Sequence, residues 1–249
     1  MIAANPLAGY LRWHAQDALL RAFTPVILFL GMGGIPLWAF ANRLGLEAMG
    51  RPGEAQEIAL QLYGNTMPLA MTLGAVILAS GLPATDREKQ YFRFLFAKPV
   101  VAWAFYLQQF LVGLVLFVLA MTLVPIGFSA VVTDVPVLPV VKSAFVFALL
   151  FGSLVSLCGA LVLKDGVAFV LVAAVSAVLQ QLDKARQLPA WLAQVADMLP
   201  PFVAADNARS AWLAGQSVAM NDMVHVIGYS VGMLASALFL VRRLPLARS

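Results

Sequence analysis

Six long stretches without a charged side chain constrain the fold of this 249-residue chain more than any other feature. They lie between successive Lys, Arg, Asp and Glu residues and cover Ala22–Asn42, Ile58–Thr85, Pro99–Thr133, Ser143–Leu163, Gly166–Leu182 and Met223–Val241. The hydrocarbon core of a bilayer is about 30 Å thick and needs roughly 20 apolar residues of helix to cross it. Each stretch reaches or nearly reaches that length. Soluble cores do not repeat this pattern, so we expect an all-α integral membrane protein.

The spans are expected within these stretches and together form one transmembrane domain, residues 1–249. Their approximate bounds are 22–41, 62–82, 100–124, 141–163, 166–182 and 223–241. The fifth is short, and Lys164 and Lys184 at its ends would extend toward the headgroups. Hydrophobic residues make up 62% of the chain and charged residues only 11%, which agrees with a chain held almost wholly in the bilayer.

The distribution of basic residues predicts the orientation, because cytoplasmic loops carry an excess of Lys and Arg. If the spans alternate, one side receives Arg12, Arg21, Arg87, Lys89, Arg93, Lys98, Lys164, Arg242, Arg243 and Arg248. The other side receives Arg43, Arg51, Lys142, Lys184, Arg186 and Arg209, spread over more loop residues. We therefore expect the protein to lie in the inner membrane of the cell, with both termini in the cytoplasm. Topology explains the basic pI without nucleic-acid binding, since no basic stripe interleaved with aromatic residues is present.

The segment Pro83–Pro99 is a charged and aromatic insert between the second and third spans. Thr85-Asp86-Arg87-Glu88 has the form of a capping box at a helix start, while Lys98 suits the helix end and Pro99 stops it. The predicted helix, 85–98, is amphipathic, and its apolar side carries Tyr91, Phe92, Leu95 and Phe96. Burying such side chains is worth about 1.5–3 kcal/mol each. They are expected to bury against lipid headgroups or the ends of the spans, or in a groove on a separate cytoplasmic protein.

Two further segments are expected to lie along the membrane surface. Residues 6–20, within an N-terminal region of 1–21, can form an amphipathic cytoplasmic helix, on which we expect His14 at the surface. Before the last span, 189–215 can form two short helices separated by Pro200-Pro201, too short to cross and placed in the outer leaflet. Their notable residues are Pro189, Trp191, Leu199, Pro200, Pro201, Trp212 and Gly215.

These elements together resemble the six-span permease subunits of type-2 ATP-binding-cassette exporters. Asp86-Arg87-Glu88, followed by Phe94 through Pro99-Val100, is similar to that family's short helix and its Pro-Val opening of the third span. Leu188-Pro189, Leu199-Pro200-Pro201 and Gly215 are similar, in order and spacing, to its outer elements. The chain departs from the family where a usual Gly is Gln90 and a frequent basic residue is Ala102.

The resemblance implies a permease that pairs with a second permease chain, as a homodimer or heterodimer, and is driven by ATPase subunits. It implies that 85–98 is the coupling helix seated in the ATPase, with Thr85, Asp86, Arg87, Glu88, Tyr91, Phe92, Leu95, Phe96, Lys98 and Pro99 at the contact. It also implies that Tyr10–Leu20 is a connecting helix and that the 189–215 pair caps an outer gate. ATP and Mg would be bound by the partner and not by this chain.

The residues themselves favour an external source of energy. The chain lacks the G-x-x-x-x-G-K-[ST] phosphate loop, so no nucleotide hydrolysis by this chain is expected. Apart from Lys142 at the very start of the fourth span, no charged residue falls inside a predicted span, whereas ion-driven carriers usually have ionisable groups at membrane depth. Uncharged polar residues remain, and Asn65, Thr72, Gln180 and Gln181 are candidates to line a substrate path or to join helices. Neither cofactor nor metal is expected, and Cys158 is the only cysteine.

Small residues at spacing four predict close helix packing on two spans. One ridge is Gly152, Ser156 and Ala160, and the other is Gly228, Gly232 and Ser236. Whether each packs within the chain or across a dimer is open at this stage.

Two other classes of protein remain as alternatives. The chain would be a membrane scaffold or assembly factor without transport if the insert binds a partner that is not an ATPase. An intramembrane serine hydrolase would need Ser153 and His225 together, but their expected depths in the membrane disagree.

Overall fold

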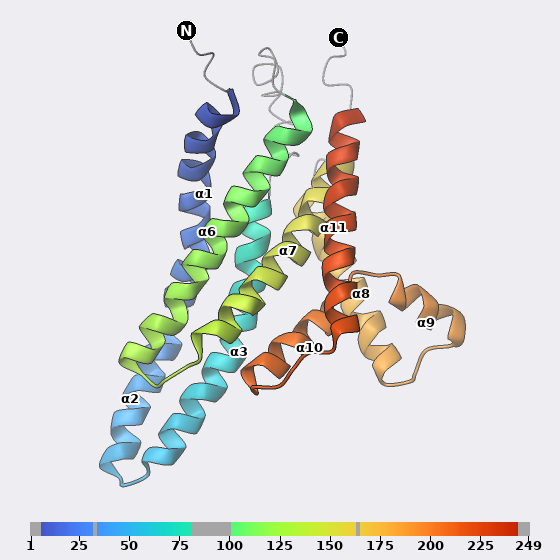
Figure 1. Ribbon diagram of the computed structural model, residues 1–249. Helices are drawn as coiled ribbons and strands as arrows, with labels where there is room; N and C mark the ends of the chain where they lie inside the picture. The colour runs from blue at the N-terminus through green and yellow to red at the C-terminus, as the bar shows by residue number, and fades with distance from the viewer. Residues whose placement is uncertain (1–5, 32–33, 81–100, 163–164, 244–249) are drawn as a thin grey trace.

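The computed structural model describes residues 6–31, 34–80, 101–162 and 165–243 (Figure 1). All regular secondary structure in these ranges is helical, namely α1 (Pro6–Gly31), α2 (Gly34–Ala48), α3 (Pro52–Ala79), α6 (Ala102–Val131), α7 (Val137–Leu161), α8 (Asp165–Lys184), α9 (Ala190–Asp197), α10 (Phe202–Leu213) and α11 (Met220–Arg243). Five of them, α3, α6, α7, α8 and α11, are long and apolar enough to cross a membrane. The expected all-helical, multi-pass class is therefore confirmed for the described part of the chain.

Helix α7 forms the centre of the molecule. In its most apolar part, 83% of the residues are buried, compared with 28% in α11 and 11% in α8. It packs against α3, α6, α8, α10 and α11, and Figure 1 shows it crossing between them. A helix that is apolar on all sides is expected in such a central position.

Small residues explain how the neighbouring helices approach α7. On the first small-residue ridge, a Cβ atom added to Gly152 would lie 3.1 Å from Cε2 of Phe110 on α6. Gly152, Ser156 and Ala160 are all buried, so this ridge packs within the chain. The second ridge, Gly228, Gly232 and Ser236 on α11, is exposed.

The first charge-free stretch differs from the expectation. It is divided between α1 and α2, and neither helix is among the five candidate spans. A sixth crossing therefore stays a prediction. Helix α1 runs without a break from Pro6 past Ala22, and residues 6–20 are therefore not a separate helix. The expected surface position of His14 is wrong, because that residue is only 1% exposed. The helical repeat places His14, Ala18 and Ala22 on one face, and α1 packs against α6 and α3.

Helices α2 and α3 form a hairpin that the sequence reading did not anticipate. Helix α3 starts at Pro52 rather than near residue 62, with the proline in its first turn, where no amide donor is needed. Gly50 turns the chain with a φ of +74°, a conformation that costs glycine little. Ion pairs Arg43–Glu47 and Arg51–Glu54 support the two helices near this turn.

The ends of the helices agree with an alternating path through the membrane. The start of α1, the end of α3, the start of α6 and the end of α11 lie at one end of the bundle (Figure 1). The α2–α3 turn, the α6–α7 turn and α10 lie toward the other end. Ser80 and Val101, the described residues nearest to the 83–99 insert, thus lie at the same end of the bundle as the start of α1 and the end of α11.

The contact at Gly152 yields a stability prediction. We expect Gly152→Leu to lower the free energy of unfolding by about 1–3 kcal/mol, because the new side chain would overlap the Phe110 ring in a packed interior. The measurement is thermal unfolding of the purified protein in mild detergent. Gly127→Leu on α6 is the matched control, because an added Cβ there would meet no other described atom within 4 Å beyond its chain neighbours and the adjoining backbone of its own helix. Equal unfolding temperatures for the two variants would contradict the central packing of α7.

Candidate functional site

The expected ATPase-coupling residues lie outside the described part of the chain. This holds for the whole set Thr85, Asp86, Arg87, Glu88, Tyr91, Phe92, Leu95, Phe96, Lys98 and Pro99. The structure does describe the residues on either side, Ser80 at the end of α3 and Val101 before α6. Ser80, the first turn of α6 with Phe105, and the residues of α1 that contact them form the candidate site and are called the insert base below.

Arg21 joins α1 to the end of α3. One guanidinium nitrogen donates a 2.9 Å hydrogen bond to the carbonyl oxygen of Ser80, and the other lies 3.2 Å from a carboxylate oxygen of Asp17. Ser80 is the residue that follows the last turn of α3, and its hydroxyl donates to the carbonyl of Val76 at 2.6 Å. The last carbonyls of a helix lack partners within the helix and favour a positive charge nearby. Arg21 supplies a hydrogen-bond donor and a positive charge to the end of α3, although it lies 59 residues earlier in the chain.

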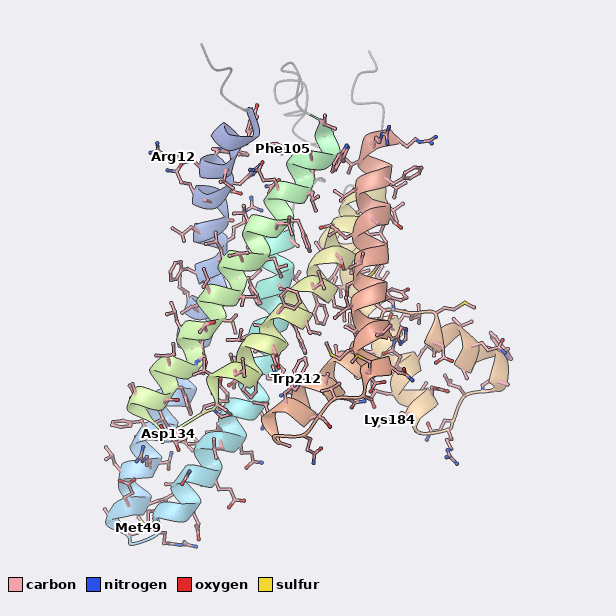
Figure 2. All side chains as sticks on the ribbon, viewed as in Figure 1. Arg12, Met49, Phe105, Asp134, Lys184 and Trp212 are labelled. Carbon is pink, nitrogen blue, oxygen red and sulfur yellow. The ribbon has the colours of Figure 1, made fainter. Side chains whose placement is uncertain are left out.

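Aromatic side chains join the same helix to the start of α6. Phe105, labelled in Figure 2, is 1% exposed and lies between rings of α1. Its ring centroid is 4.5 Å from His14, 5.4 Å from Tyr10 and 6.4 Å from Trp13. The His14 and Tyr10 pairs are edge-to-face and the Trp13 pair is stacked, and both arrangements add stabilisation beyond buried area. Helix α1 therefore contacts both described sides of the insert.

His14 is the least satisfied polar side chain of this cluster. Among the described residues, neither ring nitrogen has a hydrogen-bond partner, although His14 is buried. Burial lowers the pKa of His14 to about 4, and the nearby Asp17 carboxylate opposes that change only in part. The imidazole is therefore neutral at physiological pH and packs as an aromatic ring.

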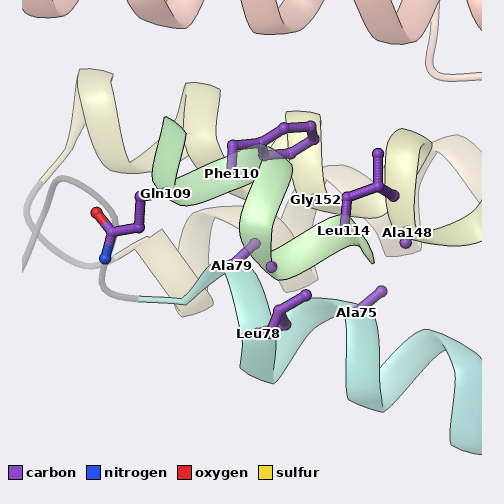
Figure 3. Close-up of a pocket in the computed structure, with 9 residues that line it drawn as sticks. Ala75, Leu78, Ala79, Gln109, Phe110, Leu114, Ala148 and Gly152 are labelled. Atoms are coloured by element: carbon purple, nitrogen blue, oxygen red, sulfur yellow. The ribbon is translucent and has the colours of Figure 1, made fainter. Parts of the chain in front are cut away.

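A small pocket lies between α3, α6 and α7 (Figure 3). Its cavity volume is about 10 Å³, enough for about one water molecule, and its lining includes Leu78, Phe110 and Gln109. Gln109 is 8% exposed, and its side-chain carbonyl oxygen has no hydrogen-bond partner within the described part of the chain. An apolar lining with one amide acceptor suits a water or a small neutral donor better than an ion.

The outer helices are held by polar side chains of two long helices. Gln180 on α8 donates from Nε2 to the carbonyl of Pro200 at 2.7 Å, and its Oε1 accepts from the amide of Val203 at 3.1 Å. The Tyr229 hydroxyl on α11 donates to the carbonyl of Met198 at 2.6 Å. The turn between α9 and α10 is thus fixed to both helices.

Helix α10 is also held from the side of α7. The ring of Phe202 stacks on Phe151 of α7, with centroids 4.9 Å apart and planes at 13°. The Lys142 ammonium lies 6.0 Å from the centroid of the Trp212 ring, at the outer limit of a cation–π contact. Helix α10 consequently packs onto the core, near the end of the bundle opposite the insert base.

The remaining residues predicted for the outer gate take structural positions in and around these helices. Pro189 caps the start of α9, and Gly215 follows α10 with a φ of +70°. Trp191 is exposed, Leu199 and Trp212 are half-buried, and Pro200 and Pro201 are buried.

The four candidate path residues do not form a common lining. Gln180 uses both amide atoms to hold the α9–α10 turn, which is a structural role. Gln181 on α8 and Asn65 on α3 are exposed, and Thr72 is half-buried.

The residues of the hydrolase alternative are not brought together either. The buried Ser153 hydroxyl donates to the carbonyl of Leu150 at 3.0 Å. His225 is exposed, and its ring lies against Tyr229. Among the described residues, no hydrogen bond joins Ser153 to His225, and no three His, Cys, Asp or Glu side chains are grouped to hold a metal ion.

The sequence analysis does not identify Arg21 or Phe105 as site residues. Arg21 is the last charged residue before the first charge-free stretch, so a position near the membrane boundary could have been inferred, but not its contact with the end of α3. Nothing in the local sequence of Phe105 indicates which helix its ring would contact.

The neutral state of His14 predicts a pH dependence of stability. Between pH about 6.5 and about 4 the unfolded chain gains a proton at His14 that the folded chain does not take up. The free energy of unfolding should therefore fall as pH drops through this range. His14→Phe should remove that part of the loss, as measured by chemical denaturation at several pH values. His225→Phe, at an exposed histidine, is the control and should keep the wild-type slope; a wild-type slope in His14→Phe would refute the assignment.

The two bonds of Gln180 predict a cost for its removal. Gln180→Leu would leave the Pro200 carbonyl and the Val203 amide without partners, at a cost of about 1–3 kcal/mol. Gln181→Leu, at the exposed neighbouring position, should have little effect. Thermal unfolding of both variants tests this, and a smaller loss for Gln180→Leu than for Gln181→Leu would be the contrary result.

Comparison with protein-family models, with curated proteins and with solved structures finds no match for this chain. The resemblance to type-2 permeases therefore stays a prediction from the sequence.

Proposed function

We propose that this chain is the transmembrane permease subunit of an ATP-binding-cassette exporter. In this proposal the chain crosses the inner membrane six times, with both termini in the cytoplasm. It moves a substrate outward using energy from a separate ATPase subunit. The supporting observation is the insert base, where one helix, α1, contacts the chain on both sides of the insert.

The contacts of the insert base would transmit a movement of the insert to several membrane helices at once. Arg21 binds the end of α3, and the ring of Phe105 at the start of α6 packs against α1. A partner that pulls on 85–98 would therefore move the ends of α1, α3 and α6 together. Rigid-body motions of this kind are common when domains close around a ligand.

The path of such a movement to the outer end runs through α7. Gly152 of α7 lies against Phe110 of α6, and Phe151 of α7 stacks on Phe202 of α10. A tilt of α6 would therefore displace α7 and, through it, the α10 cap. This arrangement supports the proposed role of the 189–215 segment at an outer gate.

The partners proposed for the complex are an ATPase subunit, which would hold ATP and Mg, and a second permease chain. The apolar sides of α8 and α11 are largely uncovered in the single chain. They are available to lipid and to a second permease. Two identical chains or two different chains would both satisfy this arrangement.

The proposal predicts that the apolar side of the insert holds the ATPase. The double variant Leu95→Glu, Phe96→Glu should lose the ATPase during purification in mild detergent, because the added charges would enter an apolar contact. ATP hydrolysis by the purified complex should fall with it. Gln90→Glu with Ala97→Glu, on the other side of the expected helix, adds the same charge and should retain more of the ATPase.

Retention of the ATPase and of its activity in the first double variant would refute the docking role. Isolation of the wild-type chain with a partner through the insert, but without any ATPase, would instead favour the scaffold alternative.

A further inference from the structure

We propose that α9 lies in the headgroup region of the bilayer, with Trp191, Val195 and Met198 in contact with phospholipid. The inference depends on α8 as a membrane-spanning helix and is independent of the transport function. It separates α9 from α10, whereas the sequence predicts both short helices in the outer leaflet.

The position of α9 along the membrane normal follows from α8. Helix α8 is a candidate span that ends at Lys184, and only residues 185–189 connect it to α9. Arg186 has a φ of 55°, and the amide of Gln187 donates to the carbonyl of Leu182, which closes the helix end in a tight turn. A short, closed connection keeps α9 beside the last turns of α8. Helix α9 is therefore at the membrane boundary where α8 ends.

The side chains of α9 form three faces. Leu192, Ala193 and Ala196 are half-buried or buried, and α8 is the main element against which α9 packs. Gln194 and Asp197 are exposed and form a narrow polar side.

The third face is apolar and uncovered. Trp191 is 65% exposed, Val195 40% and Met198 74%. Their spacing of four and three places them on one side of the helix. A helix with one polar and one apolar side at this depth is expected to lie in the interface, with its apolar side toward the acyl chains.

The surroundings of α9 favour lipid as the occupant of this face. Helix α8 is itself only 11% buried over its most apolar part, so a helix packed on its end meets the same lipid. Lys184 and Arg186 are exposed in the connection and suit the phosphates of the headgroups. Trp191 is of the residue type that is enriched at membrane interfaces. In Figure 1, α9 lies at the edge of the molecule, away from α3 and α6.

Helix α10 differs from α9 in each of these respects. Ala205 and Ala208 are buried, and Phe202 stacks on Phe151 of the central helix. Its apolar residues are thus largely covered by protein. Of the two short helices, α9 is the one that presents an apolar face to lipid.

The test is a spin-label scan of α9 in vesicles of phosphatidylcholine and phosphatidylglycerol. Single cysteines are introduced at residues 191, 194, 195, 197 and 198 of a Cys158→Ala protein that elutes as the wild type does. Power saturation compares collisions with oxygen, which concentrates in lipid, and with a water-soluble nickel chelate. A label at Leu171, exposed on α8, gives the lipid reference, and one at Gln216, exposed before α11, gives the water reference.

We expect labels at residues 191, 195 and 198 to give an oxygen-to-nickel ratio near that of residue 171. Residues 194 and 197 should give the lower ratio of residue 216. A uniformly low ratio along α9 would place the helix in water and overturn the proposal. Low accessibility to both reagents at residues 191, 195 and 198 would also overturn it, because protein would then cover that face. Spin–spin broadening in that case would identify a second copy as the cover.

Discussion

The packing of α7 against its neighbours is the interaction on which the rest of this structure depends. Lipid tails are as apolar as leucine, so helices in a bilayer associate through close packing and hydrogen bonds. Gly152 lets Phe110 approach the backbone of α7. The hydroxyls of Ser143, Ser153 and Ser156 donate to carbonyls of the same helix, so they are satisfied without loosening this contact. Helix α7 contacts α3, α6 and α10 alike, so it joins the helices of the insert base to the α10 cap.

The two ends of the molecule are built by different chemistry. At the insert base, a guanidinium and an aromatic cluster attach α1 to α3 and α6. At the other end, one glutamine and one tyrosine hold a proline-rich turn through its backbone. At both ends, side chains far away in the sequence bond to backbone carbonyls at helix ends or in turns. Such bonds position a turn without placing an ionised group in the membrane interior.

The sequence predicted the helical class because charge-free stretches of span length have few other solutions in water or lipid. It also predicted two short helices beside Pro200-Pro201, where proline prevents a continuous helix. It did not predict the early start of α3 at Pro52, because Gln56, Glu57 and Gln61 gave that region the composition of a loop. The burial of His14 and the role of Gln180 depend on which helices pack together, and the local sequence does not contain that information. The position of the insert helix stays a prediction.

The central claim is that residues 83–99 face the cytoplasm, on the side of the chain termini, where an ATPase could reach them. A single cysteine at Gln90, in the Cys158→Ala background, can be reacted with a maleimide that does not cross membranes. The account predicts labelling in inside-out vesicles and none in intact cells, while a cysteine at Gln216 should show the reverse. Labelling of residue 90 in intact cells would place the insert outside and contradict the account.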